Sequence, residues 1–192
     1  MKAEIRCVEK NAFRTVVEIC HEMMIPSGMG EELQRQREMC IDPYTRVANR
    51  SKELVPMEVK TVLTLEKSGK GLRVATTICN QAKDHRVRVV MPTGLNTSTH
   101  LADSAFEVVK RNNRHNDTWT NPCGCERQQC FAAMEDETNG LLVANRGLYE
   151  YEVLADEENA IAVTLLRSVA EMGDWGYFPT PKAQQIGTFT LE

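Results

Sequence analysis

The densest group of side chains that could do chemistry lies in one short stretch, Asp84, His85, Arg86 and Arg88. A histidine beside a carboxylate and two guanidinium groups can bind a sugar hydroxyl or a phosphate, because arginine forms paired hydrogen bonds with anions. The alternative is structural: Asp84 pairs with an arginine and His85 caps a turn at a strand end, since ion-pair networks imitate active sites. For a β-domain on its own, the residues favour the structural interpretation.

Three cysteines crowd a second stretch, Cys123, Cys125 and Cys130, and His115 could complete a zinc site. Structural zinc sites use cysteines separated by two to four residues, whereas a single residue separates the first two cysteines here. We therefore predict no metal in this chain. The chain has seven cysteines, an odd number, and its N-terminus lacks the apolar core of a signal peptide. Both features predict reduced thiols in a cytoplasmic protein.

Four further side chains could contact a sugar or another domain. Asn145 and Arg146 precede Gly147, which we expect to adopt a positive φ at a break between strands. Arg146 would then point into a cleft, or simply lie at a surface turn. Trp175 and Tyr177 lie in a glycine-bearing aromatic segment outside any strand and could stack on a sugar ring, although aromatic side chains in a β-sandwich more often fill the core.

The chain offers no pair of acids arranged for hydrolysis. Glu150 and Glu152 alternate on one face of an expected strand, where we predict that both are solvated. A glycosidase instead needs two carboxylates that face each other across its substrate. We therefore predict that this pair is not catalytic.

The elements that position these residues are almost all strands. Apolar residues alternate strictly from Met57, and after a turn at 68–71 they alternate again over 72–78, which predicts a β-hairpin. Residues 160–166 are almost wholly apolar, as in a strand buried on both faces. Residues 31–40 form the one plausible helix, with Glu31 and Arg35 one turn apart. The patterning predicts about ten to twelve strands in a single domain, residues 1–192: an all-β, large antiparallel β-sandwich with at most one short helix.

Composition excludes two classes of partner. The chain has 192 residues and a net charge of −4, which argues against nucleic acid, because phosphate binding needs a basic face. Its apolar runs are strand-sized and too short to span a membrane.

Four motifs, taken together and in order, resemble the C-terminal domain of bacterial glycoside hydrolase family 38 α-mannosidases. The resemblance covers residues 57–177. It rests on Asn80-x-Ala82-Lys83-Asp84-His85-Arg86-Val87-Arg88, Ala102-Asp103-Ser104-x-Phe106-Glu107-Val108-Val109, Asn145-Arg146-Gly147-Leu148-x-Glu150-Tyr151-Glu152-Val153 and Thr164-Leu165-Leu166-Arg167-Ser168-Val169.

The resemblance implies a galactose-mutarotase-like β-sandwich that is a fragment of a larger multidomain enzyme. Its partners would be the N-terminal catalytic and helical domains, and its substrate a mannoside, including mannosylglycerate in free or phosphorylated form. The zinc ion, its His and Asp ligands and the Asp nucleophile would lie in the catalytic domain, so this chain alone would be inactive. It would supply a cleft wall and an interface, with Asp84, His85, Arg86, Arg88, Asn145, Arg146, Trp175 and Tyr177 as substrate or interface contacts.

Two other classes of function remain open from the sequence. One is an autonomous carbohydrate-binding module. The other is a mutarotase-like sugar epimerase that uses His85 and a carboxylate as its acid and base.

Overall fold

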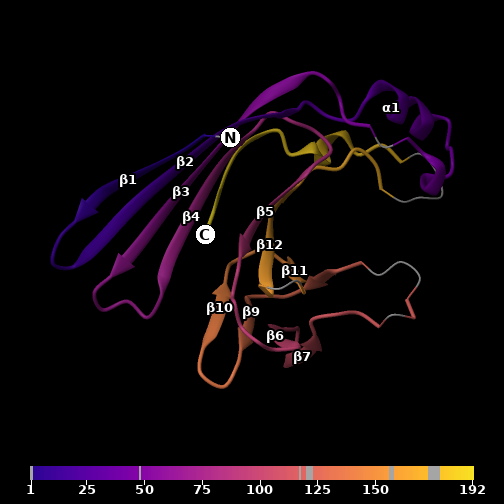
Figure 1. Cartoon of the computed structure of the whole chain (residues 1–192). Coiled ribbons are helices and arrows are strands. Elements are labelled where there is room, and N and C mark those ends of the chain that lie inside the picture. The colour runs from indigo at the N-terminus through magenta and orange to yellow at the C-terminus, as the bar shows by residue number, and fades with distance from the viewer. Residues whose placement is uncertain (1, 48, 117, 120–122, 156–157, 173–177) are drawn as a thin grey trace. The chain divides into compact units, whose positions relative to one another are not determined.

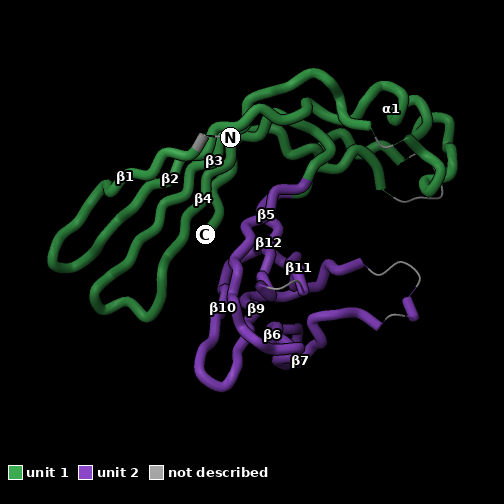
Figure 2. The backbone as a smooth tube through the Cα atoms, in the orientation of Figure 1, with its two compact units in different colours: residues 1–85, 167–192 green, residues 86–166 purple. Residues whose placement is uncertain are grey.

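The chain divides into two compact units in a computed structural model that describes residues 2–47, 49–116, 118–119, 123–155, 158–172 and 178–192 (Figures 1 and 2). Unit 1 comprises Met1–His85 and Arg167–Glu192, and unit 2 comprises Arg86–Leu166. The described residues form thirteen strands, one α-helix and two 3₁₀ turns. Within that part of the chain, no helix is both long enough and apolar enough to cross a membrane.

Unit 1 contains a five-stranded antiparallel sheet in the order β1-β2-β3-β4-β13. The predicted hairpin is confirmed as β3 and β4, in which Leu63 pairs with Val74 and Leu65 with Leu72. The bounds of the strands are β1 Lys2–Lys10, β2 Arg14–Pro26, β3 Leu54–Glu66, β4 Leu72–Asn80 and β13 Gly187–Leu191.

The helical part of unit 1 is short and lies on its surface. Helix α1 (Glu31–Glu38) buries no side chain, as its few apolar residues predict. Arg35 pairs with Glu32 at 2.8 Å, so the expected pairing with Glu31 is not the one that the helix uses. The two 3₁₀ turns are η1 (Pro43–Thr45) and η2 (Pro181–Gln184).

Unit 2 contains two four-stranded sheets, β10-β9-β6-β7 and β5-β12-β11-β8. Residues from both sheets form one buried cluster, consisting of Leu95, Ala102, Ala132, Met134, Tyr151, Val153, Ile161 and Val163. The bounds are β5 Arg86–Met91, β6 Thr99–Asp103, β7 Val108–Asn112, β8 Cys125–Arg127, β9 Phe131–Glu135, β10 Gly140–Ala144, β11 Glu150–Leu154 and β12 Ala160–Arg167. The prediction of a strand buried on both faces is confirmed, because Ala160 through Val163 are all buried in β12.

The all-β, antiparallel fold class is thus confirmed. Two strands lie outside the sequence prediction. Strand β6 buries His100 and Ala102, a polar and a small residue that give no apolar alternation. Strand β8 has only three residues. That the whole chain is one domain stays a prediction.

Candidate functional site

Asp84 and His85 end the segment that follows β4, and both belong to unit 1. Asp84 has a φ of 54°, in the left-handed region that a short polar side chain tolerates better than most. The Asp84 amide donates to Gln184 Oε1, and Gln184 Nε2 donates to Asp84 Oδ1, each at 2.9 Å. Gln184 is buried, so this reciprocal pair fixes the Asp84 turn against η2.

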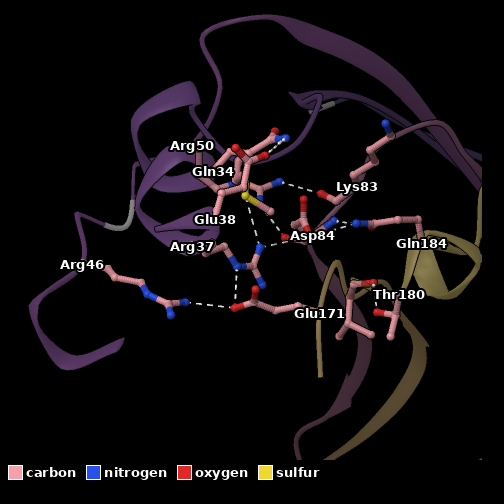
Figure 3. A network of polar contacts seen from close by, with 12 residues as sticks. Gln34, Arg37, Glu38, Arg46, Arg50, Lys83, Asp84, Glu171, Thr180 and Gln184 are labelled. Atoms are coloured by element: carbon pink, nitrogen blue, oxygen red, sulfur yellow. Dashed lines mark hydrogen bonds and ion pairs between the residues drawn. The ribbon is translucent and has the colours of Figure 1, made fainter. Parts of the chain in front are cut away.

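Asp84 also belongs to a network of ion pairs (Figure 3). Arg37 of α1 reaches the Asp84 carboxylate at 3.8 Å and Glu171 at 2.9 Å. Arg46, just after η1, binds the same oxygen of Glu171 at 2.9 Å. The Glu171 side chain is only 5% exposed, and burying a carboxylate is costly unless it has such partners. The arginine that pairs with the Asp84 carboxylate is therefore Arg37, and not one of its neighbours in sequence.

Two more side chains hold the backbone of this segment. The Arg50 guanidinium donates to the carbonyl oxygens of Asp84 and Lys83, the latter at 3.1 Å. Asn80 Nδ2 donates to the Gln185 carbonyl at 2.8 Å, and Asn80 Oδ1 accepts from the Ala82 amide at 3.1 Å. Side chains, together with a backbone bond from the Lys83 amide to the Ser27 carbonyl at 2.8 Å, thus order the residues that lead to His85.

The His85 ring has a distinctive environment. Both ring nitrogens are buried, and neither makes a hydrogen bond of ordinary geometry to another described residue. Burial lowers the pKa of His85, and the Lys83 backbone only partly opposes this effect. The lowered pKa favours the neutral imidazole at pH 7, which has one donor and one acceptor nitrogen.

Arg86 and Arg88 lie on β5 in unit 2, where they meet carboxylates of β11. Arg86 reaches Glu150 at 3.2 Å and Glu152 at 3.4 Å, and Arg88 binds Glu152 as well. Thr164 of β12, the strand between β5 and β11, donates to Glu150 at 2.7 Å. The prediction that both glutamates are solvated was wrong, because β5 brings two cations onto the same face of the sheet. The four side chains are 22–29% exposed.

The cysteine stretch joins this cluster. Arg86 Nη1 donates to Cys125 Sγ at 2.7 Å. Burial raises the pKa of the Cys125 thiol, against the opposing effect of the Arg86 guanidinium. Cys123 and Cys130 are exposed, and His115 stacks on Trp119 with ring centroids 5.2 Å apart. Within the described ranges, no group of three or more His, Cys, Asp or Glu side chains could hold a metal ion.

The remaining predicted contacts lie elsewhere. Asn145 Oδ1 accepts from the Leu148 amide at 3.0 Å, and Gly147 has a φ of 86°, as its place in the turn predicts. Arg146 is exposed at this turn. Trp175 and Tyr177 lie outside the described residues, so their roles stay predictions.

Unit 2 also contains a buried polar chain that sequence reasoning missed. The Asn113 side-chain Nδ2 donates to the Thr97 carbonyl at 2.9 Å, so Asn113 Oδ1 faces His100 Nδ1 as an acceptor at 3.0 Å. His100 Nε2 must then accept from the Tyr151 hydroxyl at 2.8 Å, and that hydroxyl accepts from Arg111 at 2.8 Å. Burial lowers the pKa of His100, in agreement with a neutral ring.

The groups that sequence reasoning missed share a reason. Arg37, Arg46, Glu171 and Gln184 come from α1, η1 and the C-terminal segment, and no local motif links them to Asp84. His100 follows no recognisable pattern either. The only signal in sequence was the polar character of Asp84 itself.

Comparison with known proteins gives one family. Residues 4–175 match the profile described as "Glycosyl hydrolases family 38 C-terminal domain". A protein of Halalkalibacterium halodurans that carries the name "Putative mannosylglycerate hydrolase" is 42% identical over 97% of this chain and 20% of its own length.

Two solved structures from Enterococcus faecalis share the fold. The first, an α-mannosidase of strain V583, superposes with a TM-score of 0.92 at 44% identity, over 98% of this chain and 21% of its own. The second, a protein in the glycosyl hydrolase family 38, gives a TM-score of 0.89 at 43% identity, over 98% of this chain and 22% of its own. The chain thus spans about a fifth of the length of the relatives that it matches.

Proposed function

Because the chain belongs to the glycosyl hydrolases family 38 C-terminal domain family, we propose that it is the non-catalytic C-terminal domain of a longer α-mannosidase. The observation that carries this proposal is the match of nearly the whole chain to about a fifth of a solved α-mannosidase. The rest of such an enzyme would supply the catalytic zinc, its ligands and the nucleophile that the family resemblance implies.

The acids of this chain support a non-catalytic role. Retaining and inverting glycosidases both place one carboxylate on each side of the scissile bond. Glu150 and Glu152 instead lie on a single strand and bind Arg86 and Arg88. Neither carboxylate is thus free to act as an acid or a nucleophile across a substrate.

His85 is the contact that we propose for the substrate or the catalytic domain. Its neutral ring makes no hydrogen bond of ordinary geometry to another described residue, and the segment that carries it is fixed by Arg50 and Gln184. A sugar hydroxyl can both donate to and accept from such a ring. An epimerase mechanism is less well supported, because the neighbouring Asp84 carboxylate binds Gln184 and Arg37 and not the His85 ring.

The proposed substrate class is an α-mannoside, and the name of the Halalkalibacterium halodurans relative makes mannosylglycerate the first candidate. Arg86 and Arg88 are neutralised by glutamates, so we do not propose this strand as a site for a phosphorylated substrate. We also propose a cytoplasmic location, the compartment in which the thiols of a chain with seven cysteines stay reduced.

Hydrolysis of 4-nitrophenyl α-mannoside and of mannosylglycerate tests this proposal. The enzyme would be a hybrid in which this chain replaces the matching fifth of the Halalkalibacterium halodurans relative. We expect the hybrid to hydrolyse at least one of the two substrates, and the 192-residue chain alone to hydrolyse neither. His85→Ala should raise the KM of the hybrid about tenfold, the effect of losing one hydrogen bond to a polar substrate group.

His115→Ala is the matched control, because it removes an imidazole from unit 2 that stacks on Trp119. It should leave KM unchanged. Hydrolysis by the isolated chain, or epimerisation of a free sugar that depends on His85, would contradict the proposed function.

A further inference from the structure

Unit 2 contains a cavity of about 710 Å³ beside the end of β11. All the described residues that line it lie between positions 100 and 155, so unit 2 builds it by itself. Strand β11, the start of β8 and the segment that follows β7 supply its walls. Proteins bind small molecules in cavities of roughly 300–1,000 Å³. The size of this cavity is therefore that of a site for a small ligand.

Two buried polar side chains form the floor of the cavity. His100 and Asn113 both line it, and they are only 3% and 9% exposed. The two side chains hydrogen-bond to each other at 3.0 Å, and Asn113 also donates to the Thr97 carbonyl. The polar floor is thus ordered before a ligand binds, which lowers the entropy cost of binding.

Close contacts between distant segments hold the walls in place. Arg114 Nη2 donates to the Ala155 carbonyl at 3.0 Å, which ties the segment after β7 to the end of β11. On the other side, a Cβ atom at Gly124 would lie only 2.7 Å from Glu152 Oε1. Glycine therefore allows the backbone before β8 to approach the Glu152 side chain, and these two contacts define the width of the cavity.

Trp119 is the aromatic side chain of the cavity. Its backbone amide donates to the Asn116 carbonyl at 3.0 Å, and Asn116 Oδ1 accepts from the Thr118 amide at 2.9 Å, so a compact turn positions the indole. His115 stacks on one face of the indole, with the two rings 18° from parallel. The Trp119 side chain is nevertheless 58% exposed. The other face of the indole is therefore a flat apolar surface on which the C–H groups of a sugar ring can stack.

The charges around the cavity favour a ligand without net charge. Glu126 binds Arg111 at 3.4 Å, and Glu152 binds Arg88, so arginines partly compensate both carboxylates of the wall. An anionic ligand would still meet these carboxylates, which disfavours a phosphate. Asn112 adds an amide, which both donates and accepts hydrogen bonds. Hydroxyl groups suit this mixture, because each can donate to a carboxylate and accept from an amide.

We propose that this cavity binds a neutral pyranose sugar, whose ring stacks on Trp119 and whose hydroxyl groups bind Asn112 and Glu126. His85 belongs to unit 1, so the cavity is not the contact proposed above, and the inference does not rest on the proposed function. An enzyme that carries such a site would retain a glycan near its surface and so raise the local concentration of that glycan.

Titration of the 192-residue chain with methyl α-D-mannopyranoside, followed by proton–nitrogen NMR, tests the inference. We expect saturable shifts of the Trp119 indole N–H and of the Asn112 side-chain amide. The Kd should be on the order of 1 mM, the affinity that the ligand efficiency of small molecules gives a single sugar ring. Glycerol has hydroxyl groups but no ring that could stack, so it should bind at least tenfold more weakly.

Single variants assign the binding to this cavity. Trp119→Ala should raise the Kd about tenfold, because it removes the stacking surface. Asn112→Ala changes an exposed side chain and should raise the Kd about fivefold, the effect of losing one hydrogen bond. Phe106→Ala is the matched control, since Phe106 is a fully exposed aromatic residue of unit 2 that does not line the cavity. It should leave the Kd unchanged, and the NMR spectrum of each variant reports whether it is folded.

Three results would overturn the inference. One is the absence of saturable shifts at sugar concentrations about fiftyfold above the expected Kd. Another is an equal loss of affinity in Phe106→Ala and Trp119→Ala, and the third is equal binding of glycerol and the sugar. The proposed function is tested separately. A chain that binds the sugar, with a hybrid that hydrolyses no mannoside, would contradict only the proposed function. Hydrolysis by the hybrid without sugar binding by the chain would contradict only this inference.

Discussion

The change Tyr151→Phe removes a single hydroxyl from the buried polar chain of unit 2, and its cost follows from the geometry. Tyr151 is fully buried, and its hydroxyl donates to His100 Nε2 and accepts from Arg111, both at 2.8 Å. His100 is 3% exposed, so its Nε2 would be left without a donor in a site that water reaches poorly. A buried polar group without a partner costs about 1–3 kcal/mol. We expect unit 2 to lose about 2 kcal/mol of unfolding free energy.

The assay is urea denaturation of the 192-residue chain at pH 7.5, with hydrogen exchange of β11 and β12 peptides to assign the transition to unit 2. With a urea m value of about 2 kcal/mol/M, the midpoint should fall by about 1 M. Tyr149→Phe is the matched control, because Tyr149 lies two residues away and is 63% exposed. Removing the hydroxyl of an exposed side chain leaves no buried group unpaired, so we expect the free energy of unfolding to change by less than about 0.5 kcal/mol.

The pH dependence is a second readout of the same chain. Burial chiefly lowers the pKa of His100 in the folded state, against the hydrogen bond with Asn113 and the charge of Glu126, while the charge of Arg111 also lowers it. The stability of unit 2 should therefore be fully present above the ordinary histidine pKa of about 6.5 and decline as pH falls below it. In Tyr151→Phe the decline should be shallower, since a protonated His100 no longer meets the tyrosine O–H. Either of two results would refute the reasoning. One is the same urea midpoint for Tyr151→Phe and Tyr149→Phe. The other is a His100→Gln variant whose stability falls with pH as much as that of the wild type.

Three further predictions concern single side chains. Gly147→Ala should destabilise the chain by about 1 kcal/mol in urea denaturation, because Gly147 has a φ of 86°, whereas Gly71→Ala, with open space and no such φ, should cost less than half as much. Glu152→Gln should lower the free energy of unfolding by about 1–2 kcal/mol, because it leaves the half-buried Arg86 and Arg88 guanidinium groups with less negative charge beside them. Glu135 is exposed, so an equal loss in Glu135→Gln would contradict a role for the ion-pair cluster. The Lys60 ammonium, chiefly by hydrogen bonding, lowers the pKa of Glu18. The stability that Glu18 contributes should thus be present above about pH 4.5 and lost as pH falls through the lower pKa of the folded state. Acid unfolding followed by circular dichroism measures this loss. A Glu18→Gln variant that unfolds at the same pH as the wild type would contradict the prediction.

Strand position was largely predictable because the information is local. The alternation through β3 and β4 and the continuous apolar run of β12 each reflect the two-residue period of a strand against solvent or core. The exceptions follow from the same physics. Strand β6 buries His100 in place of an apolar side chain, and β8 is too short to show a period.

The candidate site was predictable only in part. Sequence reasoning selected Asp84, His85 and the two arginines of β5, but assigned the glutamates of β11 to solvent. Arg86 and Glu150 are 64 residues apart and meet because β12 pairs between their strands. No local pattern encodes that neighbour, just as none places Arg37 beside Asp84.

The sequence by itself therefore determined the strands, the all-β class and the family, because side-chain periodicity and contiguous motifs are properties of neighbouring residues. Only the tertiary structure decided which charges are neutralised and which buried polar side chains are paired with one another. Those outcomes depend on strand order and on contacts between distant segments. In a low-dielectric setting the partner, and not the residue type, sets whether a polar group is stable.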